Sequence, residues 1–320
     1  MNNISDIDLK VIFDALNNNW RKFQSSLVHG NFLNTIKKNL EIETNYDKRI
    51  TGYNIDDIIF DKIVDLDSKL SVDILYSLCE KKSKNWIVGI HTFTGCKEKM
   101  LHNLLFYKKF GFNILLFDLR GHKLTDNNIC TFGVKEIIDL EVVLKWLKSK
   151  FKPKQVGIHG IDIGAYIANK FILLNKNDIY NLEFVISDST YYSYYKFIKK
   201  LIFKMANNDI PKNHKKNFDF VTDEYLRYCK EKHNINISDT SISRTLENTK
   251  STVPTLFFSS EYDDISLISE SHEFMLNRIK FEKNDHFYDL CNKSHGMGFY
   301  EKTDEYIDAV REFFRINHLI

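Results

Sequence analysis

The sequence predicts an α/β protein whose core is a doubly wound, mostly parallel sheet of about eight strands. Its 320 residues, 43% of them hydrophobic, are enough for one large domain with a filled core. From about residue 58, short strand-like runs alternate with helical patterns. This alternation favours a parallel sheet with helices on both faces.

The first elements differ in character from the rest. Residues 8–27, DLKVIFDALNNNWRKFQSSL, carry apolar side chains at three-and-four spacing, so we expect residues 1–57 to form an N-terminal helical extension. Three strand-like runs follow at 58–66, 70–78 and 85–93. They open the domain that we expect to span residues 58–320.

Helices and strands then take turns along the chain. We expect helices at 97–111, 133–151, 164–175 and 303–314, and strands at 112–122, 155–160, 182–188, 253–260 and 286–291. Gly111 suits the end of the first of these helices. A helical stretch rich in Lys, Asn and Tyr at about 190–250 interrupts the pattern and is placed where a cap could cover a site.

Composition excludes several classes of function. Lys plus Arg number 45 and Asp plus Glu 43, and the charges are interspersed, so neither nucleic acid nor an anionic membrane is indicated as a partner. The five cysteines form no CxxC pair, which argues against a disulfide framework or a zinc site. No apolar stretch has the length of a signal peptide or of a span of about 18 residues. We expect a cytoplasmic protein without a membrane anchor, while its oligomeric state stays open.

Three polar residues follow three of the predicted strands. Asp162 follows the strand at 155–160 and opens a helix, Asp263 follows the strand at 253–260, and His295 follows the strand at 286–291. Active groups of an open parallel sheet gather at the carboxyl ends of its strands. The chain order of nucleophile, acid and histidine is the order found in α/β-hydrolases.

Longer segments carry the same resemblance. Residues 86–122, 155–165, 184–193 and 254–264 in succession resemble the α/β-hydrolase superfamily, particularly the bacterial esterase-like branch with a small helical cap. The resemblance covers about residues 58–320. It implies a hydrolase that acts on a small-molecule substrate and needs neither a metal nor an organic cofactor.

The resemblance also assigns roles by position. Asp162 occupies the nucleophile elbow between two glycines in GIDIG, Asp263 occupies the acid position, and His295 matches the general base. The backbone N–H groups of Phe93 and Ile163 would form the oxyanion hole.

The sequence departs from the family pattern at three positions. The elbow holds Asp162 where most members of this branch have serine, and Thr92 follows His91 where the family usually has glycine. Threonine allows the backbone of an oxyanion-hole loop fewer conformations than glycine does. Lys123 replaces a further glycine that commonly follows RGH.

An elbow aspartate suits carbon electrophiles. A carboxylate is ionised at neutral pH and needs no base to attack. Attack on a saturated carbon gives an alkyl ester, as in the epoxide hydrolases and dehalogenases of the superfamily, and a histidine-activated water then cleaves that ester. Dehalogenases often have tryptophan after the nucleophile where this chain has Ile163, so halide binding is poorly supported.

Several alternatives stay open. Asp162 could only cap its helix, a role worth about 1 kcal/mol, in a catalytically inactive homologue that acts as a binding or regulatory protein. It could also act as a general base on water for ester or thioester hydrolysis. Asp264 and Asp188 are alternatives to Asp263 as the acid. A hydroxyl of the tyrosines in STYYSYY could donate to an epoxide oxygen, although packing of the cap is the simpler role.

Overall fold

In the computed structural model, the described residues are 4–28, 57–67, 69–80, 82–122, 129–174, 176–242, 245–246, 253–280, 282, 284–291 and 294–320. Position 123, the lysine of the RGH turn, lies outside them, as does the second half of the N-terminal extension at 29–56.

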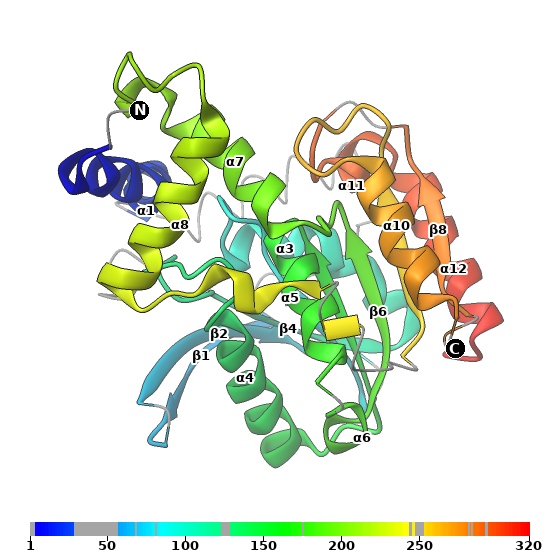
Figure 1. The fold of residues 1–320 in the computed structure, drawn as a ribbon. Helices are drawn as coiled ribbons and strands as arrows, with labels where there is room; N and C mark the ends of the chain where they lie inside the picture. Colours follow the sequence, from blue (N-terminus) through cyan, green and yellow to red (C-terminus); the bar gives the residue numbers. More distant parts are fainter. Residues whose placement is uncertain are drawn as a thin grey trace.

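An eight-stranded sheet forms the centre of the molecule (Figure 1). The strands are β1 (Ile58–Asp65), β2 (Leu70–Ser77), β3 (Asn85–Ile90), β4 (Phe112–Phe117), β5 (Gln155–Ile161), β6 (Leu182–Asp188), β7 (Thr255–Ser259) and β8 (His286–Asp289). They lie in the order β1-β2-β4-β3-β5-β6-β7-β8. The pairs β1–β2 and β2–β4 are antiparallel and all the other neighbouring pairs are parallel, so the predicted fold class is confirmed.

The register places the ends of the central strands level with each other. Ile90 at the end of β3 pairs with Phe117 of β4 and with Gly160 of β5, and Asp188 at the end of β6 pairs with Phe258 of β7. The loops that follow these strands therefore leave the sheet at one edge, where the predicted site residues lie.

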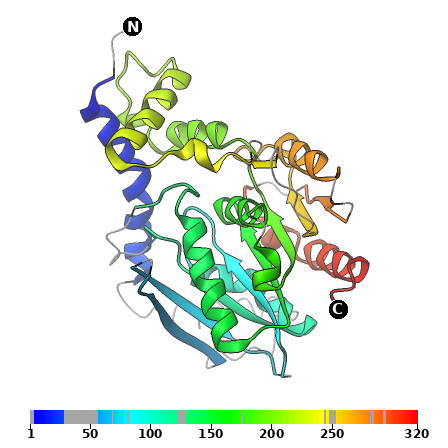
Figure 2. The ribbon, with the colours of Figure 1, turned by 60° about the horizontal axis from the view of Figure 1, so that its bottom comes forward.

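Helices cover both faces of the sheet (Figure 2). They are α3 (Lys97–Leu104), η2 (Leu105–Phe110), α4 (Glu136–Phe151), α5 (Ile163–Ile172), α6 (Asn177–Tyr180), α10 (Ile268–Arg278), α11 (Gly298–Glu301) and α12 (Thr303–Ile316). One buried apolar cluster joins the sheet to α4 and α5, and a second joins it to α3, η2 and α12.

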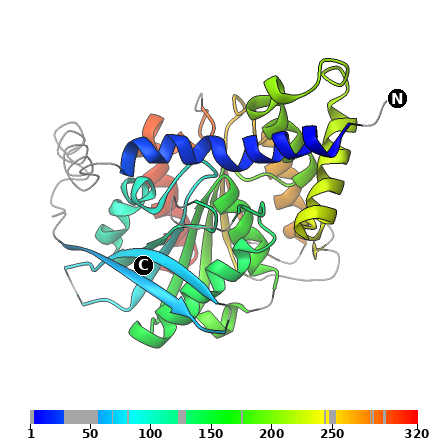
Figure 3. The same ribbon diagram turned by 90° about the vertical axis from the view of Figure 1, so that its left-hand side faces the viewer.

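The insertion at about 190–250 is helical, as predicted, in the residues that the structure describes there. It contains α7 (Tyr194–Met205), η3 (Asn207–Asp209), α8 (Phe218–His233) and η4 (Ile237–Thr240). The N-terminal helix α1 (Asp6–Val28) packs against α7 and α8 (Figure 3). Phe13 stacks on His233 with ring centroids 3.9 Å apart, and Asp6 pairs with Lys232 at 2.8 Å. The extension and the insertion thus share one helical layer.

None of the described helices is long and apolar enough to cross a membrane. Among the same residues, no three His, Cys, Asp or Glu side chains are grouped so that they could hold a metal ion.

Candidate active site

A sharp turn joins β5 to α5 and carries Asp162. Its backbone lies at φ 58° and ψ −118°, a left-handed φ that costs a residue with a Cβ roughly 1–3 kcal/mol. The turn needs glycine on both sides, because a Cβ at Gly160 would lie 2.3 Å from the Gly164 carbonyl, and one at Gly164 would lie 2.2 Å from the Ile90 oxygen. This geometry lifts the Asp162 side chain out of the strand and presents it at the edge of the sheet.

The two oxygens of the Asp162 carboxylate have different surroundings. Oδ2 accepts a 2.9 Å hydrogen bond from the N–H of Phe93. Oδ1 lies 3.2 Å from Nε2 of His295, but the two atoms are not aligned as a hydrogen bond. The side chain accepts no hydrogen bond from its own helix, so the capping role considered for Asp162 is not present in the structure.

The acid and the histidine are also brought together. His295 Nδ1 lies 2.7 Å from Asp263 Oδ2. Asp263 further accepts hydrogen bonds from the N–H of Ile265 and from both the N–H and the hydroxyl of Ser266. Of the other two acid candidates, Asp264 is exposed and pairs with Lys204 at 2.7 Å. Asp263 is therefore the carboxylate in hydrogen-bond contact with His295.

The two carboxylates together raise the pKa of His295 by more than burial lowers it. Burial alone lowers the pKa of an imidazole, but contact with Asp162, and then the hydrogen bond with Asp263, raise the pKa of His295 to about 10. Burial works against the charged form of Asp263 as well, yet His295 and Ser266 hold its pKa below the ordinary value. At neutral pH the resting cluster is an imidazolium between two carboxylates.

The loop after β3 supplies the first predicted oxyanion-hole amide. The Gly95 N–H donates to the Thr92 carbonyl at 2.9 Å, which closes a turn around Phe93. His122 Nε2 lies 2.7 Å from the Phe93 carbonyl oxygen and so fixes the far side of this turn. Ile163 is the first residue of α5, and first-turn N–H groups have no acceptor within their own helix. Threonine at 92 is thus accommodated in a turn that aims the Phe93 N–H at Asp162.

The tyrosines at the start of the insertion mostly pack. Tyr191 is buried, and its ring stacks between those of Tyr166 and Phe197 at 4.3 and 3.9 Å. Tyr195 directs its hydroxyl to Asp219 on α8.

Sequence reasoning did not find two residues that support the cluster. Ser266 donates to Asp263, and the hydroxyl of Ser189 accepts from the N–H of Gly296, next to His295. A serine three residues after the acid, in DDIS, was the available signal for Ser266. The signal for Ser189 was a small polar residue directly after a buried strand.

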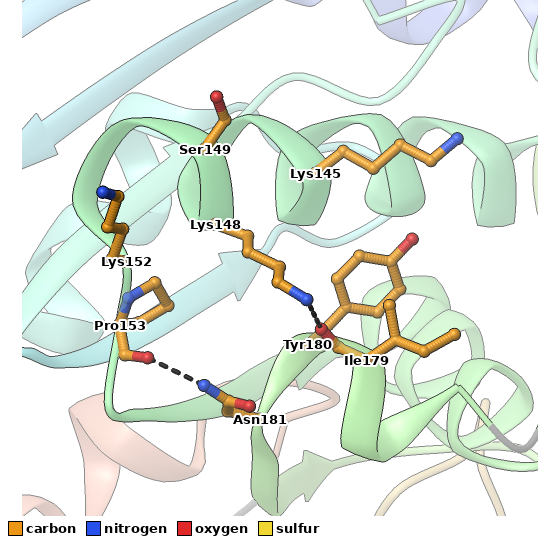
Figure 4. Close-up of a pocket in the computed structure, with 8 residues that line it drawn as sticks. All are labelled: Lys145, Lys148, Ser149, Lys152, Pro153, Ile179, Tyr180 and Asn181. Carbon is orange, nitrogen blue, oxygen red and sulfur yellow. Dashed lines mark hydrogen bonds between the residues drawn. The ribbon is translucent and has the colours of Figure 1, made fainter.

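A separate surface hollow lies just before the first residues of β5 and β6 (Figure 4). Its volume is about 770 Å³, and it lies between the end of α4 and the segment around α6. Lys148 donates to the Ile179 carbonyl across it, and Asn181 donates to that of Pro153. The lining is Lys145, Lys148, Ser149, Lys152, Pro153, Ile179, Tyr180 and Asn181, so the hollow shares no residue with the candidate active site.

Comparison with known proteins identifies the fold. No protein-family model matches the chain, and no curated protein matches it. Solved structures do. The esterase Pf2001 of Pyrococcus furiosus superposes with a TM-score of 0.62 at 17% identity, over 82% of this chain and 93% of the esterase. A serine hydrolase without a lid from Xanthomonas campestris, XC6422, gives 0.53 at 12% identity, over 81% and 94%.

A larger enzyme matches over part of its length. The acylaminoacyl peptidase of Pyrococcus horikoshii gives a TM-score of 0.56 at 19% identity, over 81% of this chain and 41% of the peptidase. The chain therefore has the α/β-hydrolase fold, as its sequence predicts.

Proposed function

We propose that the chain is a hydrolase in which Asp162 is a carboxylate nucleophile and His295 is the base that activates water. Asp263 orients His295, and the N–H groups of Phe93 and Ile163 form the oxyanion hole. The observation that carries this proposal is that the two oxygens of the Asp162 carboxylate have different contacts. Oδ2 accepts from the Phe93 N–H, and Oδ1 faces His295. A capping aspartate would instead accept from its own helix.

The first step forms an ester. Oδ1 of Asp162 attacks a carbon that carries a leaving group, the bond from that carbon to the leaving group breaks, and the leaving group takes the electron pair. Attack on an acyl carbonyl would give a mixed anhydride that readily reverts. An epoxide or a carbon–halogen bond is thus a better substrate than an ester, and Ile163 in place of a halide-binding tryptophan favours the epoxide.

Ester formation also prepares the histidine for the second step. The resting imidazolium is held by two carboxylates, and alkylation removes the charge of one of them. The pKa of His295 must then fall, because the attraction of Asp162 is its largest raising cause. The released proton goes to the ring-opened alkoxide of an epoxide, or to solvent when the leaving group is a halide.

Water completes the cycle. Neutral His295 takes a proton from a water molecule, which attacks the carboxyl carbon of the ester at Asp162. The oxyanion forms on Oδ2, the atom that already accepts from Phe93, so the hole needs no rearrangement. Cleavage of the acyl carbon–oxygen bond releases the alcohol, which takes the proton from His295. The carboxylic acid left at Asp162 then gives its proton to His295, which restores the carboxylate and the imidazolium of the resting state.

A binding or regulatory protein is the second candidate. The side chains of Asp162 and Asp263 are 6% and 1% exposed, and that of His295 is 13% exposed. The cluster is thus largely enclosed, and the charge of His295 is balanced by the neighbouring carboxylates. The layer of α1, α7 and α8 would then cover a ligand site where no chemistry occurs.

One experiment separates the two candidates. The purified chain and its His295→Gln variant are incubated with styrene oxide, chloroacetate and p-nitrophenyl acetate, and product and intact protein mass are measured. We expect turnover of the epoxide by the wild type, and a covalent mass on the Asp162 peptide in His295→Gln. Asp162→Asn is the matched control that keeps shape and loses the nucleophile. Absence of both turnover and adduct with every compound would favour the binding protein.

A further inference from the structure

Asp188, at the end of β6, is bonded to both halves of the candidate site. Its carbonyl accepts a 2.9 Å hydrogen bond from the N–H of Asp162. Its Oδ1 accepts from the hydroxyl of Ser189 at 2.9 Å, and the same hydroxyl oxygen accepts from the N–H of Gly296 at 3.2 Å. Gly296 follows His295 directly. Asp188 and Ser189 together thus link the backbone of the elbow to the backbone of the histidine loop.

A buried chain of hydrogen bonds continues behind Asp188. The Tyr306 hydroxyl lies 3.1 Å from Asp188 Oδ2 and 2.9 Å from His159 Nε2, and the Tyr107 hydroxyl lies 3.0 Å from His159 Nδ1. All four side chains are at most 1% exposed. Burial lowers the pKa of His159 to about 3, so its ring is neutral and carries one N–H.

With Ser189 as the donor to Oδ1 of Asp188, the available protons allow only two arrangements that make every one of these bonds. With Asp188 ionised, Tyr306 donates to Asp188, His159 Nε2–H donates to Tyr306, and Tyr107 donates to His159 Nδ1. With Asp188 protonated, every one of these bonds reverses, and His159 carries its hydrogen on Nδ1. Ser189 donates to Oδ1 of Asp188 in both arrangements, because that oxygen has no hydrogen in either.

We propose that Asp188 and Ser189 are positioning residues for His295, and that the charge of Asp188 sets the direction of the hydrogen-bond chain from Tyr107. Ser189 holds the Gly296 amide, which fixes the backbone from which the His295 ring extends. The ionised carboxylate of Asp188 adds to the negative charge that keeps His295 protonated in the resting state. The effect of Asp188 and Ser189 on turnover rests on the proposed function, but the direction of the hydrogen bonds between Tyr107 and Asp188 does not.

Burial and the groups around Asp188 together set the pH range in which it titrates. It faces Tyr306 of α12 and, through it, His159 of β5 and Tyr107 of η2, while the charges of His295 and Asp263 act on it from the loops after β8 and β7. Burial raises the pKa of Asp188 to about 6, against the lowering effect of its hydrogen bonds with Ser189 and Tyr306 and of the positive His295. We therefore expect these hydrogen bonds to reverse as the pH falls through about 6.

The tautomer of His159 reports the direction of the hydrogen bonds between Tyr107 and Asp188. The full-length protein is labelled with ¹⁵N-histidine, and His159 is assigned from its loss in His159→Gln. We expect the hydrogen on Nε2 at pH 8 and on Nδ1 at pH 5 in the wild type. Asp188→Asn should show Nδ1–H at both pH values, because its oxygen stays with Ser189 and its amide then faces Tyr306. The same tautomer throughout, in folded protein, would overturn the proposal.

Ser189→Gly tests the link to His295 without straining the backbone. Ser189 has φ 53°, a conformation that glycine adopts more readily, so the variant should fold and lose only the hydroxyl. We expect the pKa of His295, from the same spectra, to fall by about one unit, which corresponds to tenfold in its protonation equilibrium. Turnover of styrene oxide should lose about tenfold in kcat with KM unchanged.

Two matched controls accompany these variants. Asn234→Gly also introduces glycine at a left-handed position of φ 53°, but at an exposed site, and Asp264→Asn removes an exposed carboxylate beside the acid. Both should leave the pKa of His295 and the tautomer of His159 unchanged. A normal His295 pKa in Ser189→Gly would refute the positioning role even if nothing is turned over. Absence of turnover with the expected spectra would refute only the proposed function.

Discussion

Replacing Asp162 with asparagine should convert His295 from an imidazolium into a neutral base. Asp162 and Asp263 together raise its pKa from 6.5 to about 10 against the effect of burial, a change worth roughly 5 kcal/mol. Asp162 is the larger of the two causes, so its loss should remove at least half of that, about 2–3 kcal/mol. The His295 side chain is only 13% exposed, so little of this is screened by solvent. The expected pKa in Asp162→Asn is therefore about 8 or lower.

The assay is a pH titration of the His295 ring by NMR in ¹⁵N-histidine-labelled protein, assigned with His295→Gln. Asparagine keeps the shape of the side chain and its contact with the Phe93 N–H, so it isolates the effect of the charge. Asp264→Asn, an exposed carboxylate paired with Lys204, is the control and should leave the titration unchanged. A His295 pKa that stays near that of the wild type would refute the argument that alkylation of Asp162 switches the base on.

Four further results are expected. The pKa of His295 is raised on folding, so its contribution to stability is complete below about pH 6.5 and lost as the pH rises toward about 10; urea midpoints should fall across that range, and less so in Asp162→Asn. Asp263→Asn should lower kcat for an active epoxide by about 100-fold with little change in KM, and an unchanged kcat would deny Asp263 its role. Asp162→Ser should gain hydrolysis of p-nitrophenyl acetate if the Phe93 amide works as an oxyanion hole, and a folded variant without any gain would argue against that hole. Gly164→Ala should cost more than about 2 kcal/mol, measured by thermal melting, because its Cβ would lie 2.2 Å from the Ile90 oxygen.

The sequence predicted the sheet for a physical reason. Strands at the centre of a parallel sheet are buried on both faces, so β3, β4, β5 and β6 stand out as apolar runs, and their ends mark where loops can carry polar groups. Asp162 lies at one such end, after β5, whereas His295 follows β8, an edge strand that is not buried. The choice of Asp263 over Asp264 followed from position alone, and the structure shows Asp263 against His295 and Asp264 in solvent.

Other features needed coordinates because they depend on contacts between distant segments. The packing of Phe13 on His233 joins residues 220 positions apart and has no local pattern. The same holds for the buried bond between Tyr306 and Asp188. The difference between a capping aspartate and one directed to the Phe93 amide is a matter of side-chain orientation, which GIDIG does not determine.

The oxygen of the product tests the role of Asp162 most directly. The enzyme is mixed in excess with styrene oxide in water enriched in ¹⁸O, and the diol and the Asp162 peptide are analysed by mass spectrometry after a single turnover. A carboxylate nucleophile gives its own oxygen to the product, so we expect a diol with only light oxygen and one ¹⁸O atom in the Asp162 carboxylate. A first-cycle diol that contains ¹⁸O, with an unlabelled Asp162 peptide, would show that water attacks the substrate and that Asp162 is at most a general base.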